Sequence, residues 1–294
     1  MPSMEDRNLL PFISDRHLSL AIPLVAYWLY SFFFHSLDTY EIWPELRLHT
    51  PKELVARNHV TKKEVIREVI IQQILQTIIG LLLTSDDVKS DHGYLEAGLR
   101  IFVAFCILDT WQYFLHRLMH EWRWAYRKFH SRHHRQYVPF AFGALYNHPV
   151  EGLLLDTVGA GLSFLITGQT IREGMVFFGV STLKTVDDHG GYRLPWSPFQ
   201  MVFPNCAEYH DIHHQVWGIK SNYSQPFFVF WDRILGTQWA GPVKKTAFDP
   251  VKTRSSSTSS PPRRQTARVA SIDEVAKPKE VLQDVVEVIA MRAR

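Results

Sequence analysis

The strongest constraint on this chain is an apolar run near its beginning, over residues 18–37. The run holds no Asp, Glu, Lys or Arg over about twenty residues, the length that an α-helix needs to cross the hydrocarbon core of a bilayer. Backbone groups inside a bilayer find no water to bond, so the run can cross only as a helix. It argues against a soluble enzyme with buried helices. Because the N-terminus lacks the basic region and cleavage site of a secretory signal, we expect the run to be retained.

Further apolar stretches cover residues 69–84, 99–115, 152–171 and 175–186. The first three are candidate membrane helices, and the fourth is expected to return the chain as a partial hairpin. The sequence therefore predicts an all-α fold of multi-pass membrane helices.

Charged residues are distributed unequally between the loops. Residues 38–68 carry six Lys or Arg, whereas residues 85–98 carry four Asp or Glu and one Lys. By the positive-inside rule, the first loop is cytosolic and the second is lumenal. The third helix then leads residues 116–151 into the cytosol, and the hairpin returns the chain there. We therefore expect every cluster of histidines to lie on the cytosolic side.

Three parts of the chain differ in composition. Residues 1–98 hold the first membrane helices and the cytosolic loop, residues 99–241 hold the histidine clusters, and residues 242–294 form a tail rich in Ser and Pro. Such a tail is too polar to bury a core. After Pro278 the apolar residues recur with helical period, which predicts an amphipathic last helix.

Fifteen histidines are present, and eight of them form three clusters. One cluster places two imidazoles four residues apart, and each of the others places three at positions i, i+3 and i+4. Three imidazoles within one turn repel one another when protonated and are hard to satisfy when buried, and a metal ion removes both problems. Eight nitrogen ligands exceed what one ion accepts, so the pattern predicts a helical, histidine-rich cap that holds two metals. The candidate ligands are His116, His120, His130, His133, His134, His210, His213 and His214, with His148 and His189 from between the clusters.

Ligand type alone does not choose the metal, since imidazole suits zinc, copper, iron and nickel. A hydrolytic zinc site needs only three histidines and an open position. Eight or more histidines beside an apolar pocket favour two iron ions and dioxygen chemistry, because no side chain oxidises an unactivated C–H bond. Zinc remains the alternative. The net charge of +3 gives no sign of a nucleic-acid partner. Histidines without a partner at ligand spacing are interpreted as structural: His17, His35, His49, His59 and His92.

Carboxylates also lie beside the candidate ligands, and we expect them to orient the imidazole rings by accepting their N–H groups. Asp109 precedes His116 by seven residues, which is two helical turns and roughly 10.5 Å, so another group must intervene between them. The alternative for each carboxylate is a solvated position at the membrane interface. The candidates are Asp109, Glu151, Asp187, Asp188 and Asp211.

The cluster order His-x3-His, His-x2-His-His and His-x2-His-His resembles the fatty acid hydroxylase superfamily, which includes sterol C4-methyl oxidases, sterol C5-desaturases and sphingolipid hydroxylases. The resemblance covers roughly residues 100–240. Three stretches are more similar still to fungal and plant sphinganine C4-hydroxylases: Tyr-Val-Pro-Phe-Ala-Phe-Gly-Ala-Leu-Tyr-Asn-His-Pro-Val-Glu-Gly (137–152), Lys-Thr-Val-Asp-Asp-His-Gly-Gly-Tyr (184–192) and Tyr-His-Asp-Ile-His-His-Gln (209–215).

This resemblance implies a monooxygenase of the endoplasmic reticulum membrane that converts dihydrosphingosine or dihydroceramide to the 4-hydroxy form. It implies two iron ions, dioxygen as co-substrate, and electrons from NAD(P)H through cytochrome b5 and its reductase. The implied ligands are the eight clustered histidines and His189, with His148 as a tenth candidate. Some members of the superfamily place a further histidine where this chain has Thr185.

The expected position of the metals, near the membrane interface, limits the substrate. A lipid that enters from the bilayer presents there the carbons near its head group. C4 of a long-chain base fits this position, and so does the C4 methyl of a sterol. A sterol-directed C4-methyl oxidase or C5-desaturase, and a membrane metal-binding protein without catalysis, are therefore the alternative functions.

Overall fold

The computed structural model describes residues 8–83 and 93–242. Within these ranges every regular element is a helix, and strand-like pairing is confined to two isolated bridges. The all-α fold predicted from the sequence is therefore confirmed. The amphipathic helix expected after Pro278, and most of the loop expected on the lumenal side, lie outside the described residues.

Four helical segments in the described part of the chain are long and apolar enough to cross a membrane. Each overlaps one of the apolar stretches expected from the sequence over most of its length, which confirms the multi-pass architecture. The segments are α1 (Asp15–Thr39), α3 (Lys62–Leu83), α4 (Tyr94–Glu121) and the continuous segment Pro149–Thr167.

The segment Pro149–Thr167 changes its helical geometry along its length. It begins as α6 (Pro149–Gly152), widens into a π-helix, η5 (Leu153–Val158), and continues as α7 (Gly159–Thr167). A π-turn inside a longer helix frequently marks a functional site.

The chain then reverses and forms α8 (Ile171–Asp188), the return expected from the sequence. Gly168 ends α7 with φ +60°, a conformation that glycine adopts without cost. Thr170 and Glu173 form a capping box at the start of α8, in which the Thr170 hydroxyl accepts from the Glu173 N–H at 3.2 Å. The cap and the glycine together fix the hairpin.

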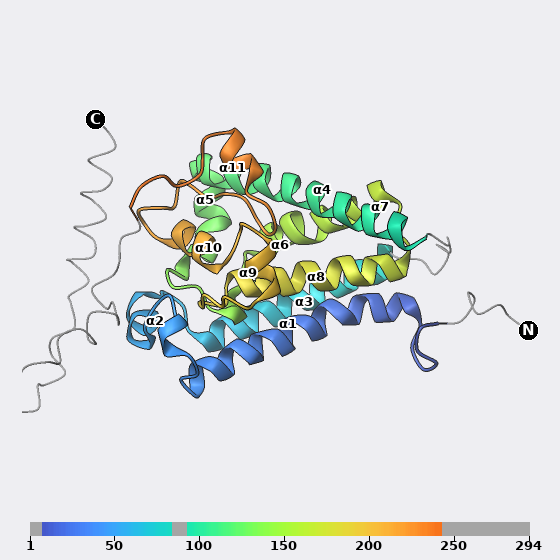
Figure 1. Ribbon diagram of the computed structural model, residues 1–294, viewed down its shortest axis with the longest axis horizontal. Helices are drawn as coiled ribbons and strands as arrows, with labels where there is room; N and C mark the ends of the chain where they lie inside the picture. Colours follow the sequence, from blue (N-terminus) through green and yellow to red (C-terminus); the bar gives the residue numbers. More distant parts are fainter. Residues whose placement is uncertain (1–7, 84–92, 243–294) are drawn as a thin grey trace, which may run out of the picture. The chain divides into compact units, whose positions relative to one another are not determined.

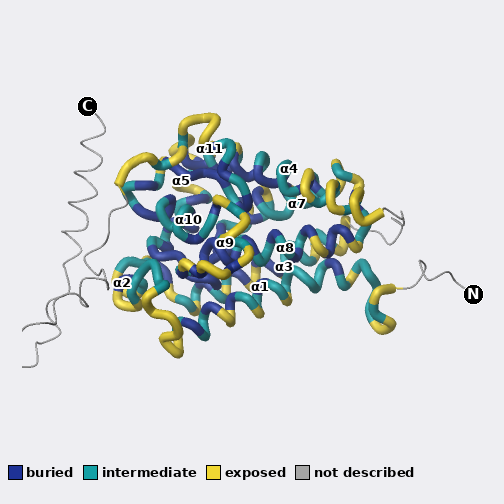
Figure 2. Tube along the Cα trace, in the orientation of Figure 1, coloured by how far each residue is buried: buried dark blue, intermediate teal, exposed yellow. Residues whose placement is uncertain are grey.

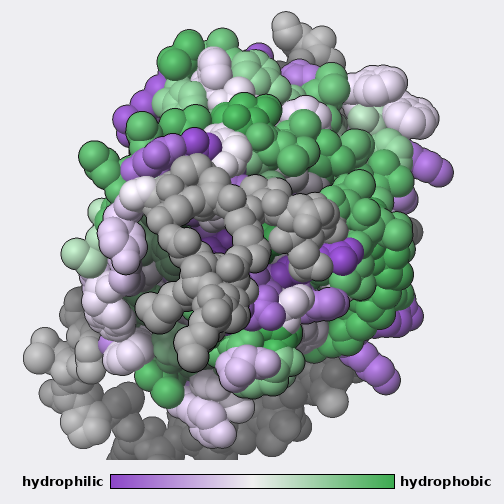
Figure 3. Space-filling model, turned by 90° about the vertical axis from the view of Figure 1, so that its right-hand side faces the viewer, coloured by the Kyte–Doolittle hydropathy of each residue, from purple (hydrophilic) through white to green (hydrophobic). Residues whose placement is uncertain are grey.

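The long helices lie along one another, with α1, α3 and α8 on one side and α4 and α7 on the other (Figure 1). Large apolar side chains on these helices face outward, among them Leu29, Ile74, Phe102 and Leu165. Figure 3 shows hydrophobic residues covering a flank of the bundle. Because a soluble protein rarely exposes so much apolar surface, this flank suits the hydrocarbon core of a bilayer.

Short helices gather at the end of the bundle where α1, α4 and α8 finish and α3 begins (Figure 1). Buried residues concentrate around this end (Figure 2). The short elements are η2 (Pro44–Leu46), α2 (Pro51–Arg57), α5 (Arg123–Lys128), η3 (His130–Arg135), η4 (Ala141–Gly143), α9 (Pro198–Val202), α10 (Ala207–His214) and α11 (Phe230–Ile234).

Candidate metal centre

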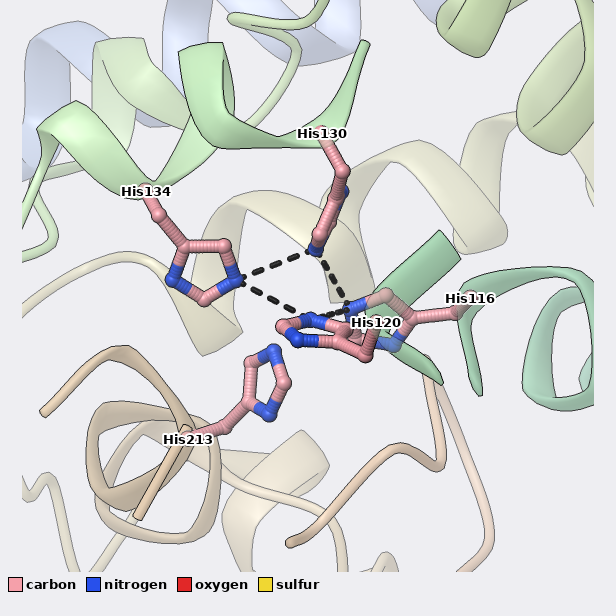
Figure 4. Close-up of side chains that lie close together, drawn as sticks. All are labelled: His116, His120, His130, His134 and His213. Carbon is pink, nitrogen blue, oxygen red and sulfur yellow. Dashed lines mark hydrogen bonds between the residues drawn. The ribbon is translucent and has the colours of Figure 1, made fainter. Parts of the chain in front are cut away.

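Nine buried histidines meet where α4, η3, α10 and the end of α8 converge, and they form two groups. Within each group the nitrogen atoms that could bind a metal lie within 4.8 Å of one another. Figure 4 shows the rings of the larger group turned toward one another. The five-histidine group comprises His116, His120, His130, His134 and His213. The four-histidine group comprises His133, His189, His210 and His214.

Each cluster of three histidines in the sequence is divided between the two groups. In α10, His210 and His214 belong to the four-histidine group, whereas His213 belongs to the five-histidine group. At about 100° per residue, positions i and i+4 of a helix lie about 40° apart, and position i+3 points about 100° away from i+4. The cluster in η3 is divided in the same way, with the middle histidine on its own. Two short helices therefore join the two groups into one centre.

The other two contributions come from longer helices. His116 and His120 lie one turn apart near the end of α4, so both rings project from one face of the helix. His189 caps the end of α8. Its Nδ1–H donates to the Thr185 carbonyl, one turn back, at 2.9 Å. Thr185 thus positions a candidate ligand through its backbone.

In six of the nine rings, a hydrogen bond at Nδ1 determines which nitrogen faces the centre. A carbonyl or a carboxylate can only accept, so the ring nitrogen beside it must carry the proton and the other nitrogen keeps a lone pair. Four more rings donate from Nδ1 to carbonyls: His116 to Tyr223 (2.8 Å), His133 to Tyr146 (3.1 Å), His213 to Ser221 (2.7 Å) and His214 to Gln136 (2.8 Å). The Nε2 atoms of these rings are thereby left to bind a metal.

The Nε2 atoms of neighbouring rings lie close together without a proton to share. The Nε2 atoms of His116 and His130 are 3.0 Å apart, and those of His133 and His189 are 3.4 Å apart. The His213 Nε2 is buried with no hydrogen-bond partner. Two nitrogens that each lie about 2.1 Å from one metal ion are about 3.0 Å apart at a right angle and about 3.4 Å apart at the tetrahedral angle. The donor set therefore fits a metal ion in each group.

Burial keeps these rings neutral, which is the form that binds metal. Desolvation lowers the pKa of His133 to about 3 and that of His189 to about 4. Desolvation is also the largest cause for the other rings outside the membrane-length helices, and the neighbouring imidazoles lower the pKa further. The pKa lies well below the ordinary value in His130, His134, His210, His213 and His214.

Two of the candidate carboxylates support these rings. Glu151 is fully buried in α6 and accepts a hydrogen bond from the Nδ1 of His130. Asp109 is buried in α4 and accepts from the backbone N–H groups of Phe227 (3.2 Å) and Phe228 (2.5 Å). It thus holds the loop of residues 222–229, whose Tyr223 carbonyl orients His116, so a backbone loop is the group that intervenes between Asp109 and His116.

The structure gives the other three carboxylates different partners. Asp187 accepts from the hydroxyls of Tyr30 (2.8 Å) and Ser197 (3.1 Å). Asp188 forms a buried ion pair with Lys184. Asp211 contacts the Nε2 of His49 at 2.8 Å and Gln215 at 3.1 Å. These three carboxylates connect elements that surround the centre. Their partners given above are residues other than the nine grouped histidines.

His148 is not brought to either group. Its side chain caps α6, with Nδ1 accepting from the Val150 N–H at 3.2 Å, and its ring packs against Phe129. Because Pro149 starts a helix directly after it, the position requires a side chain that accepts at the helix N-terminus. That local role turns the ring away from the centre.

Sequence reasoning missed Asp232, which organises the loop of residues 222–229 from its other end. This fully buried carboxylate accepts from the N–H groups of Tyr223 (3.0 Å) and Ser224 (2.8 Å). It also accepts from the hydroxyls of Tyr209 (2.8 Å) and Thr237 (2.6 Å). The signal in the sequence was a single carboxylate directly after the apolar and aromatic residues 226–231.

Two adjoining cavities connect the centre with the membrane-length helices. A small polar chamber of about 30 Å³ is lined by rings of both groups, His130, His133, His189 and His210. An apolar cavity of about 370 Å³ lies between α1, α3, α4, α7 and α8. Both cavities are lined by Gln112, Asp156, Thr185 and Pro226.

Fold and site together define a class: a multi-pass membrane protein whose buried histidine centre adjoins an apolar cavity between its helices. Residues 101–237 match the fatty acid hydroxylase family. The chain belongs to this family, since relatives share nearly half of its residues over most of their length. No solved structure matches the chain significantly.

The relatives carry names of several kinds, including a methylsterol monooxygenase of Rattus norvegicus that is 38% identical over 45% of this chain and 43% of its own length. The sphingolipid C4-hydroxylase of Saccharomyces cerevisiae is 46% identical over 80% of this chain and 75% of its own length. Sphinganine C4-monooxygenase 1 of Arabidopsis thaliana is 49% identical over 76% of this chain and 88% of its own length. A protein of Oryza sativa subsp. indica that is named very-long-chain aldehyde decarbonylase is 46% identical over 77% of this chain and 90% of its own length.

Proposed function

We propose that this protein is a monooxygenase that hydroxylates C4 of a sphingoid long-chain base, as dihydrosphingosine or dihydroceramide. The observation that carries the proposal is the pair of histidine groups that line a polar chamber beside a membrane-level apolar cavity. The names of the yeast and Arabidopsis relatives support C4 of a sphingoid base as the site of reaction.

Two iron ions are the proposed metals, and the nine grouped histidines are the proposed ligands. Iron bound there supplies the activation of dioxygen that hydroxylation of an unactivated C–H bond requires. His148 is left out of the proposed set because its ring caps α6. Glu151 orients His130 and, as a carboxylate on a ligand's N–H, makes that ring a stronger donor.

The chain's own residues restrict which carbon of the lipid reacts. The apolar cavity has room for part of a hydrocarbon chain and keeps water away from it. The chamber beside the rings is lined mostly by polar residues and holds only about 30 Å³, so it admits a short part of the lipid near the head group and excludes a long chain. Correct placement of the reacting carbon is itself a large part of catalysis. A carbon near the head, such as C4, is therefore the proposed site of attack.

We further propose that the centre faces the cytosol from the endoplasmic reticulum membrane. The histidine end of the bundle carries basic residues of α5, Arg123, Arg127 and Lys128, and the six Lys or Arg of residues 38–68. The positive-inside rule places such an end in the cytosol. Electrons from NAD(P)H, through cytochrome b5 and its reductase, could reach it there.

The proposal is tested in cells that lack their own sphingoid C4-hydroxylase and express the wild-type protein, His133→Ala or His148→Ala. Mass spectrometry measures long-chain bases, sterols and aldehydes. We expect 4-hydroxy bases with the wild type and a loss of about 100-fold or more with His133→Ala, because the four-histidine group loses a ligand. His148→Ala should keep the product, since it removes a helix cap worth about 1 kcal/mol and no proposed ligand.

Three results would contradict the proposal. An iron-loaded wild-type protein that makes no 4-hydroxy bases points to a metal-binding role without catalysis. Altered sterols with unchanged bases point to a sterol-directed enzyme, and loss of long-chain aldehydes points to the reaction named for the rice relative.

A further inference from the structure

Asp156 is a buried carboxylate that the proposed metal centre does not use. It lies in the π-helix η5, midway along a membrane-length segment. An ionisable side chain inside such a segment is costly and usually serves a function. The π-turn is a local departure from α-helical geometry at this position, and such departures frequently occur at functional sites.

The partners of Asp156 leave its charge uncompensated. Its Oδ1 accepts from the Gln112 Nε2 at 3.3 Å, and its Oδ2 is buried with no hydrogen-bond partner. The other two carboxylates that line the polar chamber each have a close partner: Glu151 bonds the Nδ1 of His130, and Asp188 forms an ion pair with Lys184. Among the described residues, no Lys or Arg forms an ion pair with Asp156. A carboxylate buried without a charged partner is costly, and a cation or strong donor from elsewhere would remove that cost.

The position of Asp156 indicates where that donor comes from. Asp156 lines both the polar chamber and the apolar cavity, so it stands at their junction. A lipid whose polar head bonds Asp156 can extend its chain into the apolar cavity. The first carbons after the head then lie in the chamber that His130, His133, His189 and His210 line. Gln112 lies beside Asp156 and lines both cavities as well.

We propose that Asp156 binds the protonated amine of a free sphingoid base and so selects this substrate over its N-acylated form. The inference rests on the proposed function and extends it to the charge of the head group. An ammonium group offers three hydrogen-bond donors and a positive charge, and the Asp156 carboxylate has no positively charged partner among the described residues. The amide of a dihydroceramide and the hydroxyl of a sterol carry no charge, and the carboxylate of a fatty acid is repelled.

The test compares two lipids that differ in this charge, sphinganine and N-acetylsphinganine. Full-length protein in nanodiscs of phosphatidylcholine is incubated with equal amounts of both and repurified, and mass spectrometry counts the bound lipids. C4 hydroxylation of each lipid is measured in parallel. The variants are Asp156→Asn, which removes the charge at nearly constant shape, and Asp156→Glu, which keeps it. Glu96→Gln is the matched control, because Glu96 is an acid of α4 that lines neither cavity and bonds Arg100.

We expect wild-type protein and Glu96→Gln to retain sphinganine over N-acetylsphinganine by about tenfold or more, the value of a hydrogen bond to a charged group. Asp156→Asn should bring the ratio to within about threefold of unity, and Asp156→Glu should keep a preference for sphinganine. Because the readout is a ratio of bound lipids, it does not depend on the fraction of active protein.

Equal retention by the wild type, or a wild-type ratio in Asp156→Asn, overturns the inference. The ratio of the two lipids bound by wild-type protein can overturn the inference even where a variant does not fold. If wild-type protein prefers sphinganine through Asp156 but hydroxylates neither lipid at C4, the proposed function fails and the amine site stands. If it hydroxylates C4 and shows no preference, the amine site fails alone.

Discussion

At the scale of single residues, Nδ1 partners determine which nitrogen of six of the nine imidazoles faces the centre. His116, His133 and His214 donate from Nδ1 to carbonyls that lie far from them in the sequence or in a neighbouring loop. His130 differs because its Nδ1 meets a carboxylate, that of Glu151. A carboxylate fixes the tautomer as a carbonyl does and also adds negative charge, which strengthens the ring as a metal donor.

The first prediction concerns Glu151→Gln. The amide oxygen can still accept from His130, but the charge is lost, so we expect the affinity for iron to fall by about 10- to 100-fold. Iron titration of the purified protein measures the change. Asp211→Asn serves as the control, because Asp211 bonds His49 and Gln215 and no grouped ring. An equal loss in both variants would contradict a specific role for Glu151.

Among the elements, the loop of residues 222–229 acts on the centre through one of its carbonyls. It has little regular structure, yet its residues are buried and two carboxylates hold it: Asp109 at Phe227 and Phe228, and Asp232 at Tyr223 and Ser224. Buried backbone N–H groups need such acceptors when no helix or strand supplies them. The loop then presents a carbonyl to His116 of the five-histidine group.

The second prediction concerns Asp232→Asn. The amide keeps the shape but loses the charge and replaces one acceptor with a donor that faces N–H and O–H groups. We expect the free energy of unfolding to fall by about 2 kcal/mol or more, as for lost hydrogen bonds to a buried charge. Denaturant titration in detergent measures it. Glu96→Gln, at a surface ion pair with Arg100, should change it by less than about 1 kcal/mol.

The same variant should also bind iron more weakly, because the loop no longer holds the Tyr223 carbonyl against His116. If Asp232→Asn lost stability but kept full iron affinity, the loop would be a structural element without influence on the centre.

Across the whole molecule, the nine rings connect segments that are remote in the sequence: α4, η3, the end of α8 and α10. Without metal, the Nε2 lone pairs of His116 and His130 face one another at 3.0 Å. A bound ion replaces this repulsion with bonds that cross-link the four segments. Anything that binds the folded state and not the unfolded chain stabilises the fold.

The third prediction is therefore that removal of metal destabilises the protein. At a metal concentration 100 times the dissociation constant, the linked stabilisation is about 2.7 kcal/mol, so a chelator should lower the melting temperature by several degrees and added iron should restore it. Scanning fluorimetry of the full chain measures the shift. His148→Ala should show the full shift and His133→Ala a smaller one. A melting temperature that changes with neither chelator nor added iron would contradict stabilisation of the fold by bound metal.

Much of the architecture could be predicted from local sequence patterns. The apolar runs matched α1, α3, α4 and the segment Pro149–Thr167, because a helix that crosses a bilayer needs a length and composition visible in the sequence itself. Eight of the nine histidines that meet in the structure were likewise recognisable by spacing, since i and i+4 share a helix face, whereas His189 was identified by its position between the clusters and by the family resemblance.

Other features depended on contacts between distant segments. His148 lies in the sequence between two histidine clusters and was a candidate ligand, but in the structure its side chain caps α6. Asp187 and Asp188 directly precede His189, yet they bond α1, the segment before α9, and Lys184. The role of Asp232 arises only when its loop folds back on it. Spacing along the chain says nothing about which side chain or carbonyl a ring will meet.

The sequence by itself determined the helical, membrane-length elements and the histidines available as ligands, because both follow from short-range periodicity. Only the tertiary structure decided how those histidines divide. Each cluster of three sends one ring to one group and two to the other, since the partners that complete each group come from different helices. It also placed Asp156 at the junction of the two cavities, because that junction forms only where η5 packs beside α4 and α8.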